Sequence, residues 1–171
     1  QQEAKWLKIP KKVSTVEVVK KIRVSTKTNL LEKIDLSLTP YLVDPISCIG
    51  NYKIKWLGAI GPTQSGKSVV LQAAVADMVD QDPGPGLYVL PDETTGKKHL
   101  DEKVISMIKA SPELSLYCTG NKRDMSYESV KLQHMTIYPA WATSIVTMNS
   151  FPMKRVFLDE VRLMGLTIGN E

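Results

Sequence analysis

Apolar residues follow two different spacings along the chain after residue 53. Short apolar runs bounded by Gly, Pro or charged residues are typical of buried strands, and they occur at Ile54–Ile60, Leu87–Leu90, Met135–Tyr138, Thr143–Met148 and Arg155–Leu158. Ser65–Asp80 and Thr94–Ala110 instead place their apolar side chains on one face at helical spacing. Strands that alternate with helices predict an α/β fold, in which a mostly parallel sheet carries helices on both faces.

The N-terminal part of the chain has a different pattern. Val13–Lys27 is rich in β-branched residues and fits either a short helix or an extended arm, and Thr28–Asp35 fits a short amphipathic piece. We expect residues 1–35 to form a basic N-terminal arm or helix and residues 36–171 to form the principal domain. Residues 1–33 carry nine Lys or Arg against three Glu, although the net charge of the whole chain is +4. This excess fits either a patch for a polyanion such as DNA or a solvated lysine-rich surface.

Composition excludes several classes of protein. The 171 residues, 43% of them hydrophobic, fit one ordinary domain with a packed core. No apolar run approaches the roughly 20 residues that a membrane-spanning helix needs. Two cysteines, Cys48 and Cys118, and two histidines, His99 and His134, favour neither a disulfide framework nor a zinc site. The chain begins at Gln1 without an apolar leader, so we expect a cytosolic fragment or an excised domain.

A phosphate-binding pattern lies between the first predicted strand and the first predicted helix. It fits GxxxxGK(S/T), the Walker A motif, and consists of Gly61, Pro62, Thr63, Gln64, Ser65, Gly66, Lys67 and Ser68. The glycines permit a tight loop whose backbone N–H groups surround a phosphate, and the positive end of the following helix faces the same place. Lys67 supplies a charge for the β- and γ-phosphate oxygens, and the Ser68 hydroxyl is a ligand for Mg²⁺.

A pair of carboxylates follows the last predicted strand. Asp159 and Glu160 come directly after an apolar run, which corresponds to a Walker B motif. At the carboxyl edge of a nucleotide-binding sheet, Asp159 can hold Mg²⁺ through water. Glu160 can orient or deprotonate the water that attacks the γ-phosphate, a role that distinguishes ATP-hydrolysing motors from small kinases.

Residues 121–124 spell NKxD, the guanine-binding motif of GTPases. They precede the Asp159 strand, whereas GTPases place a magnesium-binding DxxG before NKxD, and no DxxG occurs between Ser68 and Asn121. We therefore expect a polar loop at this position rather than a guanine site.

These residues together resemble the ATPase region of the large terminase subunit of lambda-like tailed phages, over roughly residues 36–164. Beyond the two nucleotide motifs, the resemblance depends on short segments with family-like spacing: Thr39-Pro40-Tyr41, Asp44-Pro45, Gln64, Asp82-Pro83-Gly84-Pro85, Pro91, Arg123-Asp124, Asn149-Ser150, Pro152 and Asp159-Glu160-Val161. It implies a P-loop NTPase of the ASCE type, truncated here after the Walker B strand and without the nuclease domain. Pro40 and Tyr41 fit either an adenine pocket or simple packing.

The resemblance also implies partners and a location. It implies an ATP- and Mg²⁺-dependent motor that threads double-stranded phage DNA into a procapsid, as a homo-oligomeric ring at the portal that works with a small terminase subunit in the host cytoplasm. Phe151 and Lys154 stand where the family usually carries arginines. The arginine that stabilises charge at the γ-phosphate is therefore open among Arg123, Arg155, Arg162 and a residue from elsewhere.

Two other functions share these motifs. One is a helicase-like nucleic-acid ATPase, and the other is an ATP-binding assembly module that is inactive in isolation.

Overall fold

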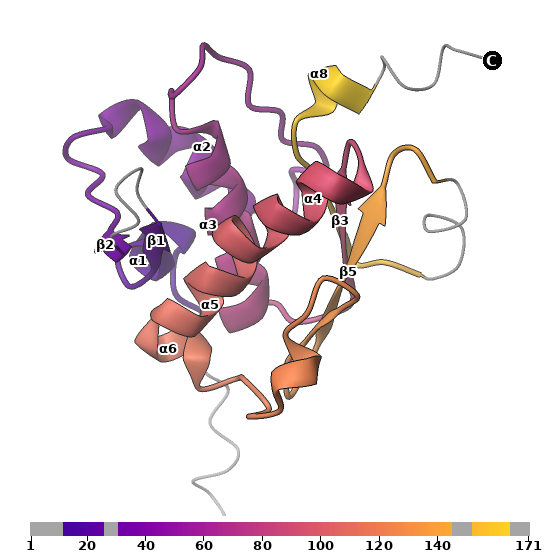
Figure 1. Cartoon of the computed structure of the whole chain (residues 1–171). Coiled ribbons are helices and arrows are strands. Elements are labelled where there is room, and N and C mark those ends of the chain that lie inside the picture. Colours follow the sequence, from indigo (N-terminus) through magenta and orange to yellow (C-terminus); the bar gives the residue numbers. More distant parts are fainter. Residues whose placement is uncertain (1–11, 26–30, 145–151, 165–171) are drawn as a thin grey trace, which may run out of the picture.

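The computed structural model describes residues 12–25, 31–144 and 152–164 (Figure 1). The strands are β1 (Arg23–Ser25), β2 (Leu31–Lys33), β3 (Gly86–Leu90), β4 (Val130–Lys131), β5 (Thr136–Trp141) and β6 (Arg155–Leu158). The α-helices are α1 (Thr15–Val19), α2 (Val43–Ile49), α3 (Lys67–Asp80), α4 (Glu93–His99), α5 (Ser106–Ala110), α6 (Pro112–Ser115) and α8 (Val161–Met164). Two 3₁₀ helices, η2 (Pro40–Leu42) and η4 (Lys122–Asp124), and one π-helix, η3 (Leu100–Ile105), complete the described elements.

The principal sheet has the strand order β4-β5-β3-β6 among the described residues. β3 has parallel neighbours on both sides, with Gly86 opposite Ile137 of β5 and Arg155 of β6. β4 pairs with β5 in the antiparallel sense, and β1 and β2 form a separate antiparallel ribbon. The predicted α/β fold with a mostly parallel sheet is confirmed for this part of the chain. All five residues of β3 are buried, as expected for the inner strand of a parallel sheet.

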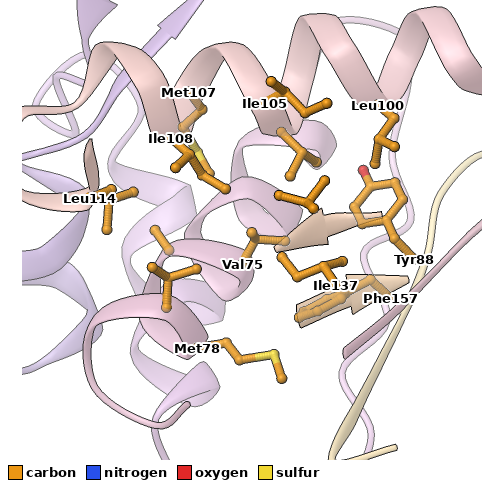
Figure 2. Close-up of a cluster of buried hydrophobic side chains, with 14 of the residues drawn as sticks. Val75, Met78, Tyr88, Leu100, Ile105, Met107, Ile108, Leu114, Ile137 and Phe157 are labelled. Atoms are coloured by element: carbon orange, nitrogen blue, oxygen red, sulfur yellow. The ribbon is translucent and has the colours of Figure 1, made fainter. Parts of the chain in front are cut away.

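One face of the sheet is covered by α3 and by the continuous run α4–η3–α5. Figure 2 shows apolar side chains of these helices meeting Tyr88, Ile137 and Phe157 of the sheet. The opposite face carries a smaller cluster around Leu87 and Val89, against which Met153 and the α8 residue Met164 pack. The alternation of side chains along β3 therefore divides the core into a large and a small part.

The prediction of a strand at Ile54–Ile60 is wrong. All residues of this segment are described, and they form neither helix nor strand. Its large side chains face outward, with Trp56 89% and Ile60 103% exposed. A strand exists only where a neighbouring strand takes its N–H and C=O groups, and no described strand lies beside this segment.

The other predicted elements agree more closely with the structure. β3, β5 and β6 occupy the runs that the sequence assigns to strands, and α3 begins two residues later than predicted. The predicted helix 94–110 is one helical run, but its middle is a π-helix. Of the predicted strand Thr143–Met148, residues 143–144 follow β5 without strand structure and residues 145–148 lie outside the described residues.

The described N-terminal residues pack against the helical layer. The Thr15 hydroxyl donates to Asp77 Oδ1 of α3 at 2.8 Å, and the Arg23 backbone N–H donates to the Ser111 hydroxyl at 2.9 Å. Val18 and Ile22 are buried in the large core. The domain boundary at residue 35 stays a prediction. None of the helices described here is long and apolar enough to cross a membrane.

Candidate functional site

The phosphate-loop pattern forms a tight turn that ends where α3 begins. Gly66 precedes the helix with φ +80°, in the left-handed region that favours glycine. A Cβ at this position would lie 2.7 Å from Leu42 Cδ1, and Leu42 is a buried residue of η2. Gly66 is therefore required both by its backbone conformation and by the side chain packed against it.

Lys67 folds back over its own loop. Its ammonium donates to the backbone carbonyl of Gly61 at 2.9 Å and to that of Pro62, and it lies 3.5 Å from the Ser65 hydroxyl. Carbonyl oxygens hold this charge at the mouth of the loop. The first N–H groups of α3 have no partner within the helix, so the loop, the helix end and Lys67 together can receive an anion.

Asp159 ends β6 and is 8% exposed. Its backbone N–H donates to the Val89 carbonyl at 3.0 Å, which extends the β3–β6 ladder to the carboxyl end of the strand. Its Oδ2 atom accepts hydrogen bonds from the Tyr88 hydroxyl at 3.1 Å and the Lys103 ammonium at 2.9 Å. Oδ1 accepts the Glu160 backbone N–H at 3.1 Å. The carboxylate is therefore held in one orientation at the edge of the sheet.

Glu160 has φ +54° although it is not glycine. Gln64 of the phosphate loop, with φ +62°, is the other non-glycine residue with positive φ in the described part of the chain. Such conformations cost energy and cluster at functional sites. Gln64 lies inside the Walker A segment and Glu160 is the second carboxylate after β6, and the Glu160 side chain remains 35% exposed.

The two motifs lie at the same end of the molecule. Arg155, at the start of β6, donates to Asp77 in the last turn of α3 at 3.0 Å, so the end of α3 adjoins the start of β6. From there α3 runs about 15 Å back to Lys67, and β6 runs about 13 Å forward to Asp159. A contact near the middle of α3 supports this antiparallel placement of α3 and β6. Gln72 of α3 donates to the backbone carbonyl of Lys103 at 2.9 Å, and the Lys103 ammonium donates to Asp159. No hydrogen bond or ion pair between described residues joins residues 61–68 directly to Asp159 or Glu160.

Residues 29–171, most of the chain, match a family described as phage terminase large subunit gpA, ATPase domain. The chain belongs to this family. Comparison with curated proteins and with solved structures gives no match. Membership implies a P-loop NTPase fold, and the resemblance identified from the sequence is confirmed.

Within this terminase domain, Arg155 forms ion pairs that connect the start of β6 to the end of α3. Its guanidinium pairs with Asp77, whose side chain is 1% exposed, and with Asp82 at 3.0 Å each. Lys154 also pairs with Asp82, and this hydrogen bond together with the Arg155 guanidinium lowers the pKa of the Asp82 carboxyl. Because Arg155 begins β6 and Asp159 follows its end, Arg155 is removed from the candidates for the γ-phosphate arginine.

The two other arginine candidates differ in position. The Arg162 Nε atom lies 3.9 Å from Glu160 Oε2, and its side chain is 76% exposed. Arg123 is exposed in η4, where the Asn121 side chain accepts the Arg123 N–H. The NKxD residues thus form a capped surface turn in the terminase domain. Asn149, Ser150 and Phe151 lie outside the described residues.

The predicted adenine residues lie beside the phosphate loop. Pro40 opens η2, Tyr41 is 59% exposed, and Leu42 packs beneath Gly66. η2 therefore connects this pair to the loop through one buried contact. Their role toward adenine stays a prediction.

Sequence reasoning missed two partners of Asp159. Tyr88 lies in an apolar strand, where a buried hydroxyl requires a hydrogen-bond partner. Lys103 interrupts the apolar stripe of its helix, since Leu100 and Met107 lie three positions before it and four after it. The sequence signal for both partners is a polar group at a position where the pattern requires an apolar side chain.

The oxygen donors fit a magnesium ion bound together with a nucleotide. Mg²⁺ is usually held by one or two carboxylates with substrate phosphates and water, and Asp159 and the Ser68 hydroxyl are donors of this kind. The Lys103 ammonium already provides a positive charge against Asp159 Oδ2. In the part of the chain that the structure describes, no group of three or more His, Cys, Asp or Glu side chains gathers into a metal cage.

Proposed function

We propose that this chain is the ATP-hydrolysing motor domain of a phage terminase large subunit, and that it powers translocation of double-stranded DNA into a procapsid. The observation that carries the proposal is that each nucleotide motif contains a non-glycine residue with positive φ. These residues are Gln64 in the phosphate loop and Glu160 after Asp159. Strain of this kind persists where a backbone must hold a functional geometry. Membership in the terminase ATPase family supports the same conclusion.

In this proposal each site residue acts on one part of the nucleotide. The loop Gly61–Ser68 binds the phosphates through its backbone N–H groups, and Lys67 exchanges its loop carbonyls for β- and γ-phosphate oxygens. Ser68 and, through water, Asp159 hold Mg²⁺, which neutralises charge on the phosphate oxygens when bound. Glu160 orients the attacking water and accepts its proton.

We further propose the ASCE arrangement of the sheet. β6 pairs with β3 along one edge, and Val156 and Leu158 on β6 are 54% and 45% exposed. The ASCE arrangement would place a further strand beside this exposed edge of β6. Truncation after the Walker B strand stays a prediction.

The proposed partners follow from the family. They are double-stranded phage DNA, the small terminase subunit and the portal, with the active domain in a homo-oligomeric ring in the host cytoplasm. Exposed Lys20, Lys21 and Arg23 beside α1 belong to the basic segment that the sequence assigned to a polyanion patch or a solvated surface.

Lys67→Ala should raise the Kd for ATP by about 10–100-fold, because a hydrogen bond to a charged group is worth about 1.5–3 kcal/mol. Isothermal titration of the variant with a non-hydrolysable ATP analogue measures this change. Lys55→Ala, which removes an exposed lysine from the preceding segment, should bind as the wild type does. An unchanged titration curve for Lys67→Ala would contradict the assignment of the loop.

The function itself is tested by ATP hydrolysis measured against protein concentration, with and without double-stranded DNA and portal. A motor domain should hydrolyse ATP faster as concentration and DNA promote assembly. Nucleotide binding without hydrolysis under every condition would instead indicate an assembly module. Strand separation without packaging would indicate a helicase-like ATPase.

A further inference from the structure

Lys103 is the cationic partner of the carboxylate proposed to bind the metal. Its Nζ atom lies 2.9 Å from Asp159 Oδ2, and the two side chains are 21% and 10% exposed. At this degree of burial an ion pair is screened far less than on the surface. The ammonium therefore has a strong effect on any other cation that approaches the same oxygen.

The backbone around Lys103 fixes the position of this residue next to Asp159. Lys103 belongs to the π-helix η3, a conformation that appears in proteins mostly as single turns, frequently at functional sites. Its carbonyl accepts a hydrogen bond from Gln72, which is 6% exposed on α3. Because α3 begins at the phosphate loop, the buried Gln72 side chain connects this helix to Lys103, which pairs with Asp159.

The remaining donors to Asp159 are less exchangeable than Lys103. Tyr88 is 1% exposed, and its buried hydroxyl has Asp159 Oδ2 as its hydrogen-bond partner at 3.1 Å, so it stays in place as a donor. The Glu160 N–H is part of the backbone. Lys103 has a long, flexible stem and is the donor that can move away.

Resting on the proposed function, we propose that Lys103 is a positioning residue that acts on the metal site through Asp159. In the absence of metal it holds the carboxylate in place and balances its charge. It competes with the Mg²⁺-bound water for Oδ2, and it thereby weakens the coupling between metal binding and nucleotide binding. Asp159 and Ser68 would hold Mg²⁺ once the nucleotide phosphates add enough negative charge to outweigh the lysine.

The test compares the Kd of a non-hydrolysable ATP analogue in EDTA with its Kd in saturating Mg²⁺. The Kd in EDTA divided by the Kd in Mg²⁺ measures how strongly the metal supports nucleotide binding, without any turnover. Lys103→Met removes the charge and keeps an unbranched side chain, and it should increase this ratio by about tenfold, the smaller effect expected for a charge-assisted hydrogen bond. Lys103→Arg retains the charge and should keep the ratio near the wild-type value.

Lys98→Met is the matched control. Lys98 lies on the same helical run and pairs with Glu102 at 3.8 Å on the surface, so its loss changes the net charge equally and should leave the ratio unchanged. An unchanged or smaller ratio in folded Lys103→Met would overturn the inference and leave the proposed function standing. Failure of the wild type to bind the analogue would overturn both.

A measurement on the wild type covers the case in which Lys103→Met does not fold. With the analogue bound, amine labelling followed by mass spectrometry should modify Lys103 several times faster in Mg²⁺ than in EDTA, because the ammonium has lost its carboxylate partner. Lys98 should label at the same rate in both. Equal rates for Lys103 would overturn the inference.

Discussion

Glutamine in place of Glu160 should lower kcat for ATP hydrolysis by about 10²–10⁴-fold, the usual contribution of a general base, and should leave nucleotide binding intact. Glutamine has nearly the shape of glutamate, so the left-handed backbone at φ +54° and the start of α8 are unchanged. It has lost the basic oxygen that accepts a proton from water. The variant therefore separates the chemical step from binding.

The experiment measures phosphate release and analogue binding on the same preparation, under the conditions that give wild-type turnover. Glu113→Gln, at an exposed position of α6, removes one negative charge away from the motifs and should behave as the wild type. Near-normal hydrolysis by Glu160→Gln would assign water activation to another residue. Loss of analogue binding would place Glu160 in the binding site instead.

The second large effect concerns stability. Arg155→Met should lower the free energy of unfolding by about 3–5 kcal/mol, the range expected when one member of a buried ion pair is removed. Asp77 would keep the Thr15 hydroxyl as a donor, but its almost fully buried carboxylate would lose its counter-charge. Urea unfolding followed by circular dichroism measures the change.

Lys154→Met is the matched control for this loss. Lys154 pairs with Asp82 at 2.5 Å, but both side chains are about 40% exposed, and such surface pairs contribute only about 0–1 kcal/mol. The double variant Arg155→Met, Asp77→Leu should recover much of the stability, because no unpaired buried charge remains. Equal destabilisation by the two single variants would contradict the role given to Asp77.

Local features were predictable because their causes are local. The glycines of the phosphate loop, the charge of Lys67 and the two carboxylates after an apolar run are properties of adjacent residues, so the sequence alone locates them. The inner strand and the two covering helices were also predictable, since their apolar spacing reports which side chains are buried.

Contacts between distant residues were not predictable in this way. Arg155 was one of three arginine candidates in the sequence, and only its pairing with Asp77 and Asp82 identifies it as a structural residue. Lys103 and Tyr88 reach Asp159 from positions 56 and 71 residues earlier in the chain. Their roles depend on the packing of helices against the sheet.

The sequence by itself determined the approximate positions of α3, β3, β5 and β6, the two nucleotide motifs and the family to which they belong. The tertiary structure decided which side chains surround Asp159, and it left residues 54–60 outside the sheet despite their apolar pattern. The physical reason is that a turn is stabilised within its own few residues, whereas strand pairing and buried ion pairs require partners that only the folded chain brings together.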